Sequence, residues 1–185
     1  MTTHQFKDRN EQMDLLYQPA MKKADETFCY EHVLVVRGQK KSRDTSISKA
    51  DLLQLTCHVR SVFADQPTRR FVHAFTLCAS VMGLWVFDRS RSYNSGPFDI
   101  YKEPEKFAPA LVGYATTDDD AMGLDTFIEL KDGSRYITLD DANGGESKVR
   151  LTSPMMRQKG VVRRGTTCFM TRSKYVAKLS IVDIE

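Results

Sequence analysis

The chain has 185 residues, of which 41% are hydrophobic and 28% charged, and its formal net charge at pH 7 is +3. That composition is ordinary for a soluble protein with a packed core, and the length suits one domain or a domain plus part of another. The weak positive charge permits an anionic partner without arguing for one. Four widely spaced cysteines and an amino terminus with no secretory hydrophobic stretch predict an intracellular protein, cytoplasmic or nuclear, with free thiols.

The first clear elements are a strand and a helix. Residues 33–36 form a short run of Val and Leu that favours a buried strand. Ser48, with Asp51 three residues later, has the pattern of a capping box, and apolar residues recur at helical spacing after it. The pair Gln66-Pro67 is expected to end this helix.

The longest apolar run follows at residues 71–88 and carries no fixed charge from Phe71 to Phe87. A membrane-spanning helix needs about 20 apolar residues, and this run is shorter and rich in aromatic and β-branched residues. We therefore expect a central β-hairpin that turns at Ala79-Ser80 or Met82-Gly83; a membrane helix is the alternative.

Residues 89–97 are expected to form a loop, and Pro104 to begin a helix that buries Phe107, Leu111 and Tyr114. Asp132-Gly133 lies between two β-rich runs and predicts a second hairpin. After a glycine-rich loop at 141–148, the remaining runs are all strand-like. The fold class is therefore α+β: a mixed sheet with a central β-hairpin and flanking helices (1–150), then a β-rich carboxy-terminal segment (151–185).

Three residues could form a metal-dependent nuclease site. Asp25 precedes the first strand, and Gln39 and Lys41 follow its apolar part. Nucleases of the restriction-endonuclease fold place a carboxylate and an acid-x-Lys pair in this way, to hold a divalent cation and orient the attacking water. Gln39 stands where an acid is usual, and its neutral amide is a weaker magnesium ligand. Gln54 and His58, one helical turn apart, could face such a site. Cationic side chains nearby could contact phosphates: Lys40, Lys41, Arg43, Arg60, Arg69 and Arg70.

Two further patterns have simpler explanations. Glu129 and Lys131, with Asp125 upstream, repeat the acid-x-Lys pattern but lead into the Asp-Gly turn, where charged residues are expected. A zinc site could use Cys29, His32, Cys57 and His58, although the adjacent second pair is not a common ligand spacing. We expect no metal to be bound.

A further candidate site lies near the carboxy terminus. Gly160 and Gly165 bracket a short apolar and basic segment, and 175–178 (Tyr-Val-Ala-Lys) follow. A glycine turn between two strands, with a lysine on the next strand, is the arrangement with which protein kinases bind nucleotide phosphates. A hairpin glycine and a surface lysine would give the same pattern.

Several segments in a fixed order resemble the fungal-type protein kinase family. They are residues 66–71 (QPTRRF), 84–90 (LWVFDRS), 95–100 (SGPFDI), 123–126 (GLDT) and 164–169 (RGTTCF). The resemblance covers roughly residues 25–182. It implies a restriction-endonuclease-like amino-terminal domain followed by the first strands of a kinase lobe.

The resemblance also assigns a nucleotide site. Residues Gly165 to Cys168 would be the nucleotide-covering turn, and Lys178 would bind the phosphates of ATP, so that Gly165, Thr166, Thr167 and Lys178 would bind the cofactor. The intact family would use ATP and Mg for Ser/Thr phosphorylation, and we expect neither to be tightly bound here.

The chain ends seven residues after Lys178, before any catalytic or metal-binding loop of a kinase. We therefore expect a fragment or remnant that phosphorylates nothing alone and serves as an interaction or regulatory module. The carboxy-terminal strands would pack back on the first domain, pair with a protein partner or self-associate, because they would form a strand pair with one apolar face that needs cover: Val162, Phe169, Val176, Leu179 and Ile181. The alternative is a degenerate nuclease-like domain that binds nucleic acid through Asp25, Gln39 and Lys41. Neither alternative involves a membrane.

Overall fold

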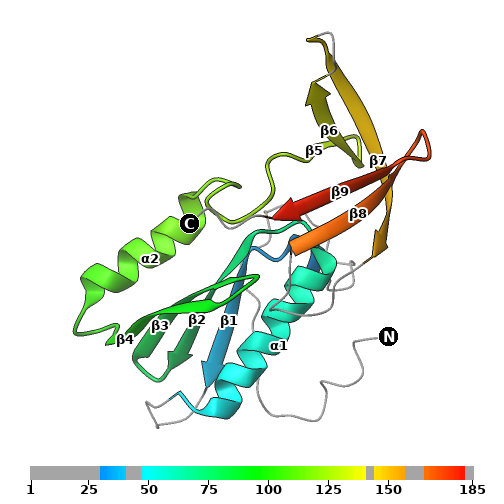
Figure 1. Ribbon diagram of the computed structural model, residues 1–185. Helices are drawn as coiled ribbons and strands as arrows, with labels where there is room; N and C mark the ends of the chain where they lie inside the picture. Colours follow the sequence, from blue (N-terminus) through cyan, green and yellow to red (C-terminus); the bar gives the residue numbers. More distant parts are fainter. Residues whose placement is uncertain (1–29, 41–46, 141–143, 157–164, 182–185) are drawn as a thin grey trace.

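The computed structural model describes residues 30–40, 47–140, 144–156 and 165–181, and in them the chain forms two β-sheets and two α-helices (Figure 1). The first part contains η1 (Tyr30–His32), β1 (Val35–Lys40), α1 (Lys49–Asp65), β2 (Phe71–Cys78), β3 (Val81–Asp88), β4 (Ser92–Asp99) and α2 (Pro104–Thr116). The second contains β5 (Glu129–Lys131), β6 (Ser134–Asp140), β7 (Glu146–Met156), β8 (Gly165–Thr171) and β9 (Val176–Ile181). The predicted α+β class is confirmed.

The central hairpin is β2 and β3, and it turns at Ala79-Ser80 as one of the two alternatives predicted. Ala79 takes a positive φ of 50°, which a two-residue hairpin turn favours. β1 joins β2 in parallel, and β4 joins β3 in antiparallel, so the first sheet is mixed with the order β1-β2-β3-β4. In the described part of the chain, no helix has the length and apolar composition needed to cross a membrane.

Helix α1 covers one face of this sheet. Its amino terminus has the predicted capping box: the Asp51 amide donates to Ser48 Oγ, and the Ser48 amide donates to the Asp51 carboxylate at 2.7 Å. Its apolar stripe packs on β1, β2 and β3 in a core cluster that includes Leu55, Val59, Val62, Phe63, Val72 and Phe87. The helix ends at Gln66, as predicted, because Pro67 follows.

Helix α2 lies on the opposite face and is less buried (Figure 1). Phe107 and Tyr114 pack partly against a second core cluster that contains Phe75, Met82, Phe98 and Met122. The prediction that α2 also buries Leu111 is wrong, because 38% of that residue is exposed. No residue of α2 is fully buried.

The prediction of a loop over residues 89–97 is also wrong for most of its length. Ser92–Asp99 form β4, which pairs with β3 from Phe87↔Ser92 to Val81↔Asp99. This strand has no clear sequence signal, because it contains polar residues, Gly96 and Pro97. An edge strand tolerates all of them because one side faces solvent. Phe98 is the residue that anchors β4 in the core.

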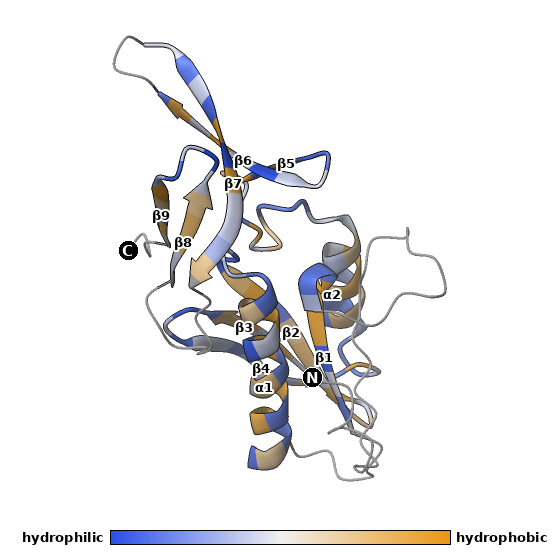
Figure 2. Cartoon of the chain, turned by 90° about the vertical axis from the view of Figure 1, so that its right-hand side faces the viewer, coloured by the Kyte–Doolittle hydropathy of each residue, from blue (hydrophilic) through white to orange (hydrophobic). Residues whose placement is uncertain are grey.

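The second sheet is antiparallel with the order β5-β6-β7-β8-β9, and both views place it beyond one end of the first sheet (Figure 1, Figure 2). The predicted Asp132-Gly133 hairpin is confirmed between β5 and β6, with φ values of 51° and 70° at the two turn residues. A small core of Ile128, Ile137, Leu151 and Phe169 holds one face together. The predicted boundary between residues 150 and 151 falls within β7, which pairs with β6 and β8, and the domain division stays a prediction.

Candidate functional site

The predicted kinase-like residues lie on strands β8 and β9. Lys178 is in β9, directly opposite Cys168 of β8 in the antiparallel register, and its side chain is exposed. Thr166 lies opposite Ser180, and their hydroxyl oxygens are 3.2 Å apart. Because side chains alternate along a strand, Thr166, Cys168 and Lys178 share one face of the sheet. We call this surface the Lys178 face; its other members are Met170, Val176 and Ser180.

Thr167 lies on the opposite face of β8. It is buried, and its hydroxyl donates a hydrogen bond of 3.0 Å to the carbonyl oxygen of Pro67. Phe169 and Leu179 also face this way and join the small core of the second sheet. The structure therefore places Thr166 and Lys178 on one face of neighbouring strands and Thr167 on the other face.

Two details of the carboxy-terminal prediction need correction. Gly165 begins strand β8, so the segment from Gly165 to Cys168 is a strand and not a turn. Residues 157–164, which link β7 and β8 and include Gly160 and Val162, lie outside the described residues. Val176 does not share the face of Phe169 and Leu179, because it pairs with Met170 and is 53% exposed.

Arg69 is fully buried at the point where the two sheets meet. Its five N–H groups bond five acceptors: the carbonyls of Val33, Leu34, Phe71 and Met122, and the side-chain oxygen of Gln66. Burial lowers the pKa of Arg69 to about 10. The prediction that Arg69 contacts phosphates is therefore wrong, since all of its donors are used inside the protein.

Arg89 is the second buried arginine and lies beside the first. Its guanidinium donates to the carbonyls of Pro67 at 2.8 Å and Arg69 at 3.1 Å and lies 4.0 Å from the centre of the Phe63 ring. Burial lowers the pKa of Arg89 to about 10 as well. We call Arg69, Arg89 and the carbonyl groups that they bind the arginine junction. It fastens the end of α1, the start of β2, the segment before β1 and the loop after α2 to one another.

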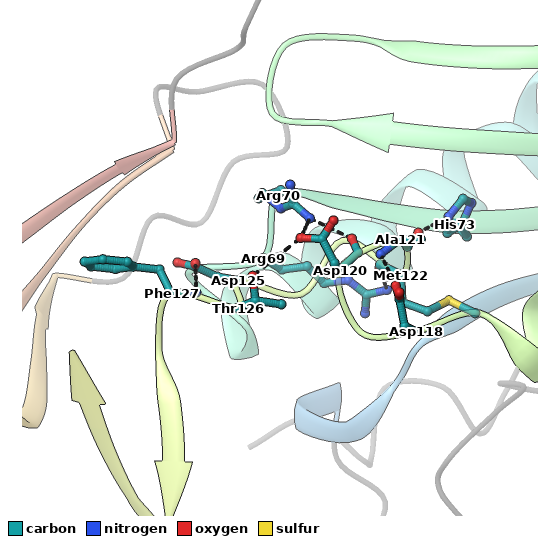
Figure 3. A network of polar contacts seen from close by, with 10 residues as sticks. All are labelled: Arg69, Arg70, His73, Asp118, Asp120, Ala121, Met122, Asp125, Thr126 and Phe127. Atoms are coloured by element: carbon teal, nitrogen blue, oxygen red, sulfur yellow. Dashed lines mark hydrogen bonds and ion pairs between the residues drawn. The ribbon is translucent and has the colours of Figure 1, made fainter. Parts of the chain in front are cut away.

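The loop after α2 is held against β2 by several polar contacts (Figure 3). Arg70 forms an exposed ion pair of 2.7 Å with Asp120, and the ring Nε2 of His73 is 3.0 Å from the carbonyl oxygen of Ala121. Gly123 has a φ of 82°, and a Cβ atom there would lie 2.3 Å from the carbonyl oxygen of Phe71. Only glycine fits at that position.

The nuclease-like candidates are not assembled by the described residues. Gln39 is in β1 and half-buried, opposite Leu77 of β2, while Asp25 and Lys41 lie outside the described residues. His58 is buried, and its Nδ1 lies 2.8 Å from the hydroxyl of Tyr30. Burial lowers the pKa of His58 to about 4, so it is neutral at physiological pH.

The two remaining patterns are the acid-x-Lys pair of Glu129 and Lys131 and the possible zinc ligands. Glu129 accepts hydrogen bonds from Lys148 at 2.6 Å and Thr138 at 3.2 Å on the exposed surface of the second sheet, and these contacts lower its pKa. Cys29 lies outside the described residues. Among those that are described, no group of three or more His, Cys, Asp or Glu residues could hold a metal ion.

The fold and these contacts define a class of protein: an α+β domain with two buried arginines, joined through the bond between Pro67 and Thr167 to a β-meander that presents a lysine. The sequence model of the family described as fungal protein kinase matches residues 12–185, nearly the whole chain. The chain belongs to this fungal protein kinase family, which confirms the resemblance and supports a kinase-related function. No curated protein and no solved structure matches the chain significantly.

Four of the five segments that carry the family resemblance lie at or next to the arginine junction. Residues 66–71, 84–90, 123–126 and 164–169 supply its two arginines, the carbonyl of Pro67, Gly123 and Thr167. Sequence reasoning did not assign these residues a structural role. The available signal is the placement of Arg69 and Arg89 just outside the two ends of the apolar run that forms the hairpin.

Proposed function

We propose that the chain supplies the phosphate-facing strands of a fungal-type Ser/Thr protein kinase, mounted on an α+β domain, and that by itself it is a non-catalytic interaction or regulatory module. The observation that carries the proposal is the position of Lys178 on an exposed strand face of a chain that belongs to this family. A lysine ammonium group on such a strand neutralises nucleotide phosphates in kinases.

The residues of the Lys178 face fit part of a nucleotide site. Lys178 would bind phosphate oxygens, and the Thr166 hydroxyl could donate to the same oxygens from the neighbouring strand. Thr167 does not fit this role, because its hydroxyl is committed to Pro67 on the other face. ATP, when bound, supplies the phosphoryl group that the intact family transfers.

The same face presents no carboxylate. Its members carry one ammonium group, two hydroxyls and three sulfur-containing or apolar side chains. Magnesium in kinases is held by Asp and Asn oxygens, so the metal-binding groups would come from outside this face. This is the reason for proposing an accessory role for the chain when it acts alone.

The experiment is isothermal titration of ATP into the full chain, with and without Mg²⁺. We expect weak binding that Lys178→Ala reduces about tenfold or more, the effect of losing one charge-assisted contact. Lys131→Ala is the matched control, since Lys131 is an exposed lysine at the far edge of the same sheet. No heat at millimolar nucleotide would contradict the nucleotide site, and phosphoryl transfer above the Lys178→Ala background would contradict the non-catalytic role.

The partner would use the outer edge of β9. Within the described residues, β9 pairs only with β8, so one row of its backbone groups faces away from the sheet. A protein partner or a second copy could add a strand there and cover Val176. Light scattering that gives the mass of one monomer would exclude self-association, and strong protection of β9 amides from hydrogen exchange in that monomer would exclude a free edge.

A further inference from the structure

A pocket of about 570 Å³ lies between helix α2 and the face of β3 and β4, and no residue of the Lys178 face lines it. Its walls are mostly apolar, and they include Leu84, Val86, Tyr93, Gly113 and Tyr114. Small-molecule sites in proteins typically have volumes of roughly 300–1,000 Å³ and linings of this kind. The pocket therefore has the size and character of a ligand site.

The pocket exists because α2 turns small residues toward it. Ala110 and Gly113 are three residues apart and thus lie on one side of the helix, and Thr117 follows directly after its end. A Cβ atom added at Gly113 would have no other atom within 4 Å, so the space beside it is open. Larger residues at these positions would have filled the gap between α2 and the sheet.

His73 and Tyr114, whose rings lie beside each other in the pocket lining, each have a polar atom that makes no hydrogen bond with any described residue. His73 Nε2 lies 3.0 Å from the Ala121 carbonyl, which can only accept, so this nitrogen carries the proton and Nδ1 is left as an acceptor. Burial lowers the pKa of His73 and keeps this neutral form. The hydroxyl of Tyr114, whose ring centre is 5.6 Å from that of His73, is the second atom, and burial raises its pKa to about 12.

The chemistry of the ligand follows from the lining. None of the residues that line the pocket carries a formal charge at neutral pH, so a charged ligand would lose hydration without gaining a partner. The Ser95 hydroxyl is already used, because it donates to the Gly96 carbonyl and accepts from the Leu84 amide. The other polar side chains in the lining are Tyr93, Asn94 and Thr117, of which Tyr93 and Asn94 are exposed. His73 and Tyr114 are half-buried with ring centres 5.6 Å apart, so together they offer a ligand one acceptor and one hydroxyl.

We propose that this pocket binds an uncharged, planar aromatic small molecule. Its ring N–H would donate a hydrogen bond to His73 Nδ1, and a second ring atom would accept a hydrogen bond from the Tyr114 hydroxyl. The flat ring system fits between the apolar surfaces of α2 and β3. Such a site is separate from the nucleotide contacts proposed for Lys178 and does not depend on them.

The test uses the full chain, labelled with ¹⁵N, and the neutral probe 2-phenylbenzimidazole, which has one ring N–H beside one ring acceptor. We expect the probe to shift the amide signals of Ala110, Gly113 and Ala121 in a saturable way. Its 1-methyl derivative, which lacks the N–H, should bind about tenfold more weakly or worse. Tyr114→Phe, which keeps the ring, should weaken the parent probe by a similar factor.

A blocking variant separates the pocket from the rest of the surface. Gly113→Leu should abolish binding, because its side chain enters the open space, and it should keep the fold because leucine favours a helix more than glycine does. Ala108→Leu is the matched control on an exposed position of the same helix outside the pocket and should bind as the unmodified chain does. Equal affinity for both probes, retained binding in Gly113→Leu, or no shift at millimolar probe would each overturn the proposal.

Discussion

The hydroxyl of Thr167 and the carbonyl of Pro67, one hundred residues apart in the sequence, are joined by a hydrogen bond of 3.0 Å. The same carbonyl accepts a bond of 2.8 Å from Arg89. Strand β8, which is next to the strand that carries Lys178, is thus fastened directly to the end of helix α1. The first sheet and the proposed nucleotide strands therefore share a common support.

Replacing Arg69 should strongly destabilise the protein. In Arg69→Met the carbonyls of Leu34 and Met122 lose their donor, and each unsatisfied group costs about 1–3 kcal/mol; the Val33 carbonyl loses one of two donors and keeps the bond from Gln66 Nε2. We expect the free energy of unfolding, measured in urea, to fall by about 3 kcal/mol or more. Arg70→Met is the control: its exposed pair with Asp120 should account for about 1 kcal/mol or less. Similar losses in the two variants would contradict the structural role of Arg69.

Thr167→Val should loosen the second sheet from the first. The change keeps the shape of the side chain and removes the donor to Pro67, with an expected cost of about 1 kcal/mol. Hydrogen exchange of β8 and β9 amides should become faster, because the fastening is local. Thr166→Val alters the neighbouring residue on the opposite face and should leave exchange nearly unchanged; a larger effect there would refute the assignment of faces.

Gly123 and Gly133 allow a direct test of close packing, because both have positive φ values, 82° and 70°. Gly133→Ala should cost about 1 kcal/mol, the backbone penalty alone, since nothing lies near its Cβ position. Gly123→Ala adds a collision with the Phe71 carbonyl and should cost at least about 2 kcal/mol more. Equal melting temperatures for the two variants would show that the loop after α2 does not contact β2 in this way.

His58 should make the protein less stable in acid. Its pKa is about 4 in the folded state and about 6.5 when unfolded, because burial disfavours the charged form. As the pH falls from 6.5 toward 4, the unfolded chain takes up a proton that the folded chain does not, so stability falls across this range. With allowance for partial hydration, the loss attributable to His58 is about 2 kcal/mol.

The variant His58→Gln isolates this contribution. Glutamine keeps a group that can bond the Tyr30 hydroxyl and does not titrate. Urea denaturation at several pH values should show a shallower decrease in stability for the variant than for the unmodified chain below pH 6.5. Parallel curves would mean that His58 is protonated in the folded protein.

The amino-acid sequence by itself determined the elements whose signals are local. The apolar run without fixed charge at residues 71–87 specified the central hairpin, Ser48 and Asp51 specified the start of α1, and Asp132-Gly133 specified the second hairpin. In each case the residues that interact lie within a few positions of one another, so the local sequence suffices to predict the element. The order of motifs likewise identified the family.

Only the tertiary structure decided the roles of Arg69, Arg89 and Thr167, the existence of β4, and the pocket beneath α2. The acceptors of Arg69 come from residues as distant as Val33 and Met122, so its burial has no local pattern. β4 is a strand because β3 offers it a partner, not because its own residues favour one. The pocket depends on how closely a helix approaches a sheet, which is set by side chains on separate segments. These features are decided by contacts between distant parts of the chain, and those contacts exist only after folding.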